Sequence, residues 1–166
     1  VKKGDSFFVK VTIQLDDYWY NYGFVSILND EGIGPAASEL SVKPAESFEQ
    51  IQNIYVDKPE FKYDEGFEMT IDIYKNAEFL IPLIAKKDID FSNDNISVVL
   101  YTQLCDTVRC LPSTEYIAKI ASSEFSISDL DLSKKIKISI TYDENSYPIA
   151  SYPDYFKRDE LSKDSP

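Results

Sequence analysis

Apolar and polar residues alternate along several stretches of the chain, and this period of two limits the fold more than any other feature. Val9, Val11 and Ile13 are separated by Lys10 and Thr12. Successive side chains of a strand point to opposite faces, so this alternation is typical of a strand with one buried face. No segment shows the 3.6-residue period of an amphipathic helix. The sequence therefore predicts a chain built from strands.

Several such segments are rich in β-branched and aromatic residues. Turn-forming residues lie between them, at positions 30–32, 34–35, 64–66 and 92–95. Many short strands with turns between them favour two antiparallel sheets packed as a β-sandwich, and we predict an all-β domain. The expected strands are 9–15, 69–73, 79–85, 96–103, 115–120 and 136–142.

The regular pattern ends at Tyr142, which suggests a domain over 1–142 and a C-terminal tail or linker over 143–166. The latter segment holds three prolines and many charges, a composition typical of a linker. Its aromatic residues leave an alternative open, in which they pin the segment along the sandwich. These residues are Tyr147, Tyr152, Tyr155 and Phe156.

The charge balance and the missing residue types exclude several functions. With 17 basic and 29 acidic residues the formal charge is −12, so we expect neither nucleic acid nor an anionic membrane surface as a partner. The longest apolar run, 79–85, is too short to span a bilayer. The chain has no histidine, which excludes Ser-His-Asp and Cys-His catalysis and the usual zinc sites. Five scattered glycines form no nucleotide-binding motif, so we expect no cofactor and no metal.

The chain has two cysteines, Cys105 and Cys110, with four residues between them. They lie between an apolar segment, 98–101, and Pro112. A loop that leaves a strand and returns beside it brings two Cα atoms within the roughly 4.4–6.8 Å of a disulfide. A disulfide would indicate an oxidising compartment. Closing so short a loop stabilises the fold by only about 2 kcal/mol. On spacing alone a structural disulfide is still favoured over a redox-active one, because most disulfides of secreted proteins are inert.

The surroundings of the cysteine pair carry a more specific signal. Residues 101–112 read Tyr-Thr-Gln-Leu-Cys-Asp-Thr-Val-Arg-Cys-Leu-Pro. They resemble the active-site loop of the N-terminal periplasmic domain of the thiol:disulfide interchange protein DsbD family, which carries Tyr-x-x-Cys-Asp and Cys-Leu-Pro-Pro after a strand. Three other segments resemble the same family in the same order, and together they extend over roughly residues 6–120. They are 17–22 (Asp-Tyr-Trp-Tyr-Asn-Tyr), 30–35 (Asp-Glu-Gly-Ile-Gly-Pro), and 62–67 (Lys-Tyr-Asp-Glu-Gly-Phe) followed by Ile73 and Tyr74.

The chain departs from the family pattern at two positions. Tyr18 stands where the family has glycine, and Ser113 replaces the second proline after the cysteines. Neither change removes a group that does chemistry.

The resemblance implies an immunoglobulin-like sandwich that acts as a protein-disulfide reductase in the periplasm or another extracytoplasmic compartment. Such a domain takes electrons from a membrane-embedded donor domain and reduces periplasmic proteins of the thioredoxin fold, as in cytochrome c-type biogenesis. We accordingly expect a monomer, tethered to the inner membrane through further domains of a longer protein.

The resemblance also implies roles for individual residues. Cys110 would attack the partner disulfide and Cys105 would resolve the mixed disulfide. Phe67 would be the cap ring that shields the sulfurs, although a core phenylalanine explains it equally well. Tyr20 and Tyr22 would line the site, although an aromatic strand face explains them as well.

Three acidic residues would complete the site by exchanging protons and raising the thiol pKa. They are Asp64, Glu65 and Asp106. On the surface of an acidic protein such residues are more often merely solvated.

Two other functions compete with this hypothesis. An extracellular adhesion or binding module with a structural disulfide would suit the glycosylation sequon at Asn95, Ile96 and Ser97. A glycosidase would need two carboxylates at a cleft, and the sequence singles out no such pair. Solvent access to the cysteines distinguishes an exchange site from a structural disulfide.

Overall fold

The computed structural model describes residues 1–120 and 130–158, and in this part of the chain the regular structure is almost entirely strand. The only helical element described is one short 3₁₀ turn, η1 (Ala45–Ser47). In the same ranges no helix is long and apolar enough to cross a membrane. The strands are β1 (Ser6–Gln14), β2 (Tyr20–Tyr22), β3 (Glu39–Lys43), β4 (Asn53–Val56), β5 (Glu60–Asp64), β6 (Met69–Tyr74), β7 (Asn76–Ile84), β8 (Ser97–Thr102), β9 (Leu104–Cys105), β10 (Thr114–Lys119), β11 (Ile136–Tyr142) and β12 (Pro148–Ser151).

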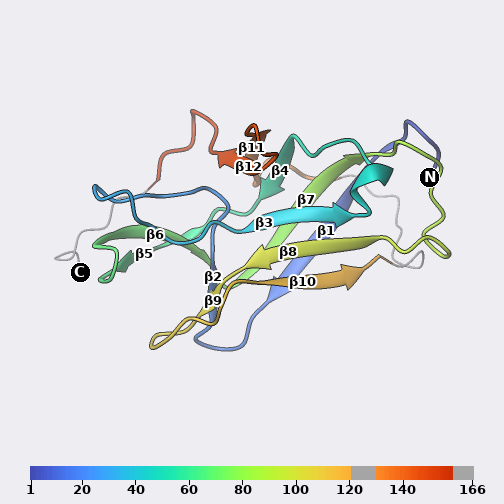
Figure 1. Cartoon of the computed structure of the whole chain (residues 1–166). Helices are drawn as coiled ribbons and strands as arrows, with labels where there is room; N and C mark the ends of the chain where they lie inside the picture. The colour runs from blue at the N-terminus through green and yellow to red at the C-terminus, as the bar shows by residue number, and fades with distance from the viewer. Residues whose placement is uncertain (121–129, 159–166) are drawn as a thin grey trace.

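The strands pair antiparallel in three groups. One sheet has the order β1-β7-β4-β11-β12, a second β10-β8-β3, and a third β5-β6-β2-β9. A single residue, Gln103, separates β8 from β9, so the second group leads directly into the third. β3, β8 and β10 lie across β1 and β7, whereas β5 and β6 lie at the end away from the N-terminus (Figure 1). The expected all-β antiparallel sandwich is confirmed, with the two-layer architecture of immunoglobulin-like domains.

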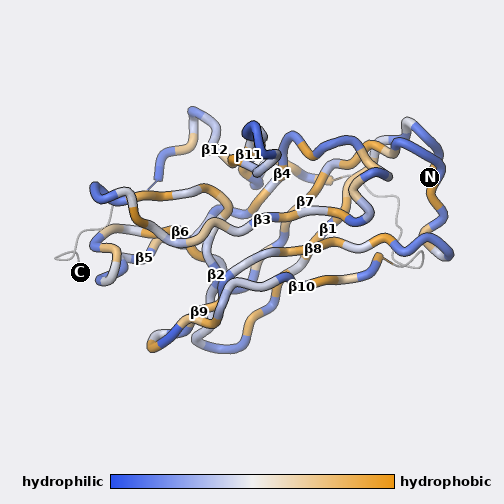
Figure 2. The backbone as a smooth tube through the Cα atoms, viewed as in Figure 1, coloured by the Kyte–Doolittle hydropathy of each residue, from blue (hydrophilic) through white to orange (hydrophobic). Residues whose placement is uncertain are grey.

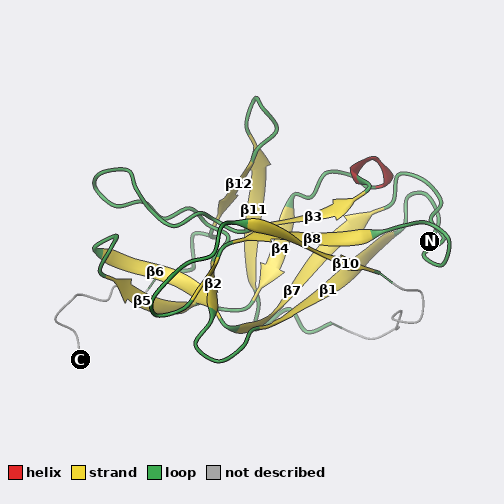
Figure 3. Ribbon diagram, turned by 60° about the horizontal axis from the view of Figure 1, so that its bottom comes forward, coloured by secondary structure: helices red, strands yellow, loops and turns green. Residues whose placement is uncertain are grey.

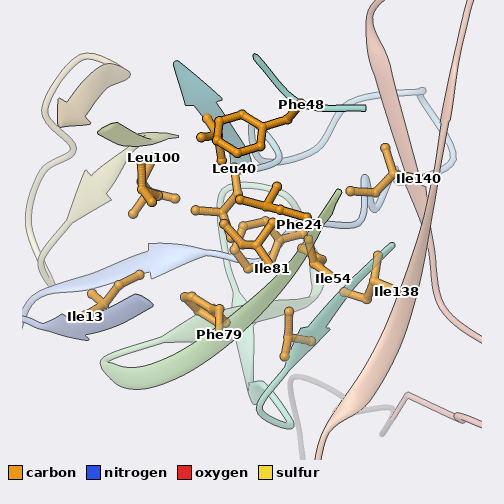
Figure 4. Close-up of a cluster of buried hydrophobic side chains, with 14 of the residues drawn as sticks. Ile13, Phe24, Leu40, Phe48, Ile54, Phe79, Ile81, Leu100, Ile138 and Ile140 are labelled. Atoms are coloured by element: carbon orange, nitrogen blue, oxygen red, sulfur yellow. The ribbon is translucent and has the colours of Figure 1, made fainter. Parts of the chain in front are cut away.

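The main core lies between these layers and takes side chains from both. Phe79 and Ile81 of β7 meet Leu40 of β3 and Leu100 of β8 (Figure 4). Phe79 and Ile81 are fully buried, and burying a side chain of this size stabilises the fold by roughly 1.5–3 kcal/mol. Apolar and polar residues are interspersed along the chain (Figure 2), and in β1, β3 and β11 every second residue is the more buried one. The period-two pattern thus reflects one face turned to this core.

The segment expected to be a tail or linker is instead packed on the sandwich as far as it is described. β12 pairs with β11 and forms the last strand of the five-stranded sheet. The two strands project together as a hairpin (Figure 3). Tyr152 and Phe156 pack against the core cluster, which is the alternative that the aromatic residues left open. Residues 159–166 of the expected tail lie outside the described residues.

Candidate redox site

The two cysteines form a disulfide at the end of β9. Their Sγ atoms are 2.04 Å apart and their Cα atoms 4.0 Å apart. Cys105 ends β9 and forms an isolated antiparallel bridge with Cys110 across a tight turn. On its other side β9 pairs with β2, where Tyr20 lies opposite Cys105. The disulfide therefore closes a small hairpin at the edge of the four-stranded sheet.

Asp106 builds the turn of this hairpin. Its Oδ1 atom accepts hydrogen bonds from the backbone N–H groups of Val108 and Arg109, both at 2.8 Å. The Asp106 N–H donates to Arg109 O, and the Leu111 N–H donates to Leu104 O. The hydrogen bonds from Val108 and then Arg109 lower the pKa of Asp106. This carboxylate is thus ionised at neutral pH and serves the loop as its turn-forming group.

The two sulfurs differ sharply in their surroundings. Cys105 is fully buried, in a cluster with Tyr20, Tyr22, Ile71 and Ile73, whereas Cys110 is exposed. A thiolate attacks whichever sulfur it can reach. The geometry therefore presents Cys110 to an incoming protein and keeps Cys105 behind it.

The Tyr22 hydroxyl group contacts both sulfurs. It lies 3.3 Å from Cys105 Sγ and 3.6 Å from Cys110 Sγ. A disulfide sulfur carries no proton, so the hydroxyl group is the donor. Burial, followed by the neighbouring Tyr20 and Asp64, raises the pKa of Tyr22 to about 12. The phenol therefore keeps its proton at neutral pH and is available as a hydrogen-bond donor.

Tyr20 packs edge-on against the Tyr22 ring, with centroids 6.1 Å apart. Burial raises the pKa of Tyr20, with smaller contributions from the charges of Asp64 and Asp106. The two tyrosines and two of the three expected acids thus lie in one electrostatic environment.

Phe67 lies on the turn between β5 and β6 and packs, half-buried, against the cluster that contains Cys105. Asp64 holds this turn, since its Oδ1 atom accepts a hydrogen bond from the Phe67 N–H at 3.0 Å. The side-chain amide of Asn29 donates to Phe67 O at 3.2 Å. Glu65 lies exposed on the same turn. The structure therefore brings Phe67 and Asp64 to the cysteine end of the sandwich, with Glu65 at its surface.

Two basic residues that sequence reasoning did not single out also lie here. The Arg109 guanidinium lies 5.9 Å from the centre of the Trp19 ring. The Lys62 ammonium lies 5.5 Å from the centre of the Tyr20 ring. Arg109 lies within the recognised segment 101–112 and Lys62 begins the segment 62–67, but a basic residue in a motif gives no signal that an aromatic ring will lie beneath it.

An apolar groove of about 890 Å³ lies away from the disulfide, between β1 and β10. Asn21 and Leu104 line it, next in sequence to the tyrosines and Cys105. None of its described lining residues is an aspartate or a glutamate. The glycosidase alternative therefore finds no carboxylate pair in this groove.

Comparisons with known proteins give one similar structure. No family model and no curated protein matches the chain. A search of solved structures found the N-terminal domain of DsbD from Neisseria meningitidis in its reduced form, 21% identical, with a TM-score of 0.44. The match covers 74% of this chain and 79% of that chain. This solved domain belongs to the DsbD family, and residues 101–112 of the present chain resemble the active-site loop of that family.

Proposed function

We propose that this domain is a thiol-disulfide oxidoreductase that accepts electrons at the Cys105–Cys110 pair and reduces the disulfides of partner proteins. The observation that carries the proposal is the contrast between the two sulfurs: Cys105 is fully buried and Cys110 is exposed. Exchange needs one sulfur within reach of a partner and a second held close by to complete the reaction. A disulfide with only a structural role has no need of this asymmetry.

The reaction is a two-electron exchange in two steps. In the reduced domain the Cys110 thiolate attacks one sulfur of the partner disulfide, which forms a mixed disulfide and releases one partner thiolate. The Cys105 thiolate then attacks Cys110 Sγ, which re-forms the intramolecular disulfide and releases the second partner thiolate. The partner gains two electrons and takes up two protons, and the domain is oxidised. A dithiol donor restores the reduced domain by the same steps in reverse.

The surrounding side chains have supporting roles in this proposal. The protonated Tyr22 hydroxyl stabilises the developing thiolates, since a hydrogen bond to a charged sulfur is stronger than one to a disulfide. Phe67 and Tyr20 exclude water and small thiols from the buried side of the pair. Asp64 positions Phe67, and Asp106 shapes the cysteine turn. Both acids, with Glu65, supply negative charge that raises the thiol pKa and favours proton uptake.

The partners we propose are periplasmic thioredoxin-fold proteins and a membrane-embedded electron donor, with the domain acting as a monomer and tethered to the inner membrane. The reaction suits an extracytoplasmic compartment, where disulfides persist. Residues 101–112 resemble the active-site loop of a family that exchanges disulfides, which supports partners of this class. Val108, 89% exposed, and Leu111 lie beside Cys110 and offer an apolar rim for a docking protein.

The reduction potential of the pair separates this function from the binding module with a structural disulfide. A relay must lie between a thioredoxin-like donor and an isomerase-like acceptor, so we expect a potential between roughly −200 and −270 mV. The domain is equilibrated in glutathione or dithiothreitol buffers, free thiols are trapped, and the oxidised fraction is fitted. A value below about −300 mV would identify a structural disulfide and favour the binding module.

A further inference from the structure

The strand that lies beneath the redox site is buried on both faces. Successive side chains of β6 point to opposite sides, so Ile71 and Ile73 face the cluster around Cys105 while Asp72 faces away from it. The Asp72 side chain is only 1% exposed. A buried carboxylate requires a partner, because an unpaired buried charge is strongly destabilising.

That partner comes from the C-terminal segment. Arg158 donates to Asp72 Oδ1 from Nε at 2.9 Å and from Nη2 at 2.7 Å. The Tyr152 hydroxyl donates to the other carboxylate oxygen, Oδ2. Arg158 Nη2 also donates to the backbone carbonyl of Thr70 at 2.9 Å. We call these residues, Asp72, Tyr152 and Arg158, the clasp.

The same segment also covers the neighbouring strand, β5. The Phe156 ring stacks on Phe61 of β5 with centroids 6.5 Å apart. The Arg158 guanidinium lies 6.0 Å from the centre of the Phe61 ring. Residues 152–158 thus bind both strands of the hairpin whose turn holds Phe67.

Apart from the clasp, this hairpin is attached through β2, through the Gly23 N–H, which donates to Asp72 O at 3.0 Å, and through Tyr74, which packs in the main core. β5 is an edge strand that pairs only with β6. β6 pairs with β2 at two positions, where Asn21 faces Tyr74 and Tyr22 faces Ile73. The second of these positions holds the tyrosine that contacts both sulfurs. A shift of the hairpin would therefore move Phe67 and disturb Tyr22 together.

We propose that Arg158, with Tyr152 and Asp72, is a positioning residue that keeps the β5–β6 hairpin, and therefore Phe67, closed against the cysteine pair. This proposal rests on the cap role of Phe67 in the proposed function. It adds the contacts that hold the β5–β6 hairpin, and with it Phe67, in place over the site. Arg158 touches neither sulfur. It acts by holding the opposite face of the strand whose front face packs against the site.

The test is the rate at which iodoacetamide alkylates the buried Cys105 thiol in the Cys110→Ser background. Replacing Arg158 with methionine keeps most of the apolar part of the side chain. It removes the hydrogen bonds to the Asp72 carboxylate and to the Thr70 carbonyl group of β6. We expect the hairpin to open and close faster than the thiol reacts, so the rate should follow the open population and rise about tenfold. In the Phe67→Ala background the cap is already absent, so Arg158→Met should add little. This non-additivity identifies an effect transmitted through Phe67.

Two further variants separate positioning from stability. Ile96 is a buried residue of the main core, outside both the cluster around Cys105 and the β5–β6 hairpin. Ile96→Val is therefore the control: it should lower the melting temperature and leave the alkylation rate of Cys105 unchanged. Tyr152→Phe removes one hydroxyl and keeps the Arg158 ion pair, so it should raise the rate about two- to threefold even if Arg158→Met folds poorly.

An unchanged rate in both clasp variants would overturn the proposal. So would a rise that Ile96→Val reproduces, or one that persists in full without Phe67. Access to the Cys105 thiol is measured whether or not the pair serves exchange, so these outcomes are independent of the reduction potential that tests the proposed function.

Discussion

The hydroxyl group of Tyr22 lies 3.3 Å from the Sγ atom of the buried Cys105. A phenol in this position with a pKa of about 12 donates a hydrogen bond at every physiological pH. A reduced sulfur, and a thiolate above all, accepts such a bond more strongly than a disulfide sulfur does. The contact therefore favours the reduced state over the oxidised state.

Replacing Tyr22 with phenylalanine should make the reduction potential more negative by about 30 mV, since the reduced pair loses a hydrogen bond of about 1.4 kcal/mol. The potential is measured in glutathione buffers. Tyr20→Phe is the matched control, because its ring lies in the same cluster while the hydrogen bonds to the sulfurs described here come from Tyr22. Equal shifts in the two variants would contradict a specific role for the Tyr22 hydroxyl.

The unequal exposure of the sulfurs predicts unequal variants. Cys105→Ser leaves Cys110 free at the surface, so this variant should form a stable mixed disulfide with oxidised glutathione. Cys110→Ser leaves a buried thiol and should react at least about tenfold more slowly. Intact mass spectrometry over time follows both reactions. If Cys110→Ser reacted as fast as Cys105→Ser, the assignment of Cys110 as the attacking cysteine would be wrong.

Truncating the cap should expose the buried sulfur. Phe67→Ala removes the ring that packs on the cluster around Cys105, and in the Cys110→Ser background we expect Cys105 to react about tenfold faster with iodoacetamide. Phe8→Ala is the control, because Phe8 is a half-exposed ring on β1 that packs against Tyr55. Shielding by Phe67 is refuted if the two variants match the unaltered domain.

The position where the chain departs from the family glycine offers a test of stability. Tyr18 has φ = 73° and is 81% exposed, and this left-handed conformation costs a residue other than glycine about 1 kcal/mol. Tyr18→Gly should therefore raise the free energy of unfolding in urea by about 0.5–1 kcal/mol. Tyr147→Gly, at an exposed tyrosine without a positive φ, should lower it.

In the described ranges the sequence predicted the strands of six or more residues and missed the shorter ones. The six expected strands correspond to β1, β6, β7, β8, β10 and β11. All three residues of β2 are buried, so it shows no alternation. β9 has two residues, and β12 lies in a Pro-containing segment whose composition is that of a linker. These strands form because they pair with segments far away in the sequence, and the local sequence pattern does not reveal such pairing.

The sequence also predicted part of the candidate site, namely the cysteine pair and its aromatic neighbours, and missed the clasp. The order of the recognised segments placed the cysteines, Phe67 and the two tyrosines in one neighbourhood, which the structure describes as a single cluster with Phe67 packed against it. It gave no sign of the clasp, because Asp72 and Arg158 are 86 positions apart in the sequence. A single aspartate in an alternating strand is normally assigned to the solvent face. The burial of Asp72 depends on a segment that the composition had assigned to a linker.

The hairpin that carries the cysteines has a consequence for the energy of each redox cycle. Hydrogen bonds from Leu111 N to Leu104 O and from Asp106 N to Arg109 O close it on either side of the sulfurs. These bonds do not involve the sulfurs, so we expect the turn to keep its shape when the covalent link is cut. Reduction would then require little reorganisation of the backbone, and its cost in folding stability would be limited to the roughly 2 kcal/mol that closing the loop contributes. Such a site can cycle repeatedly, because the work of each electron transfer is confined to the two sulfurs and the side chains that touch them.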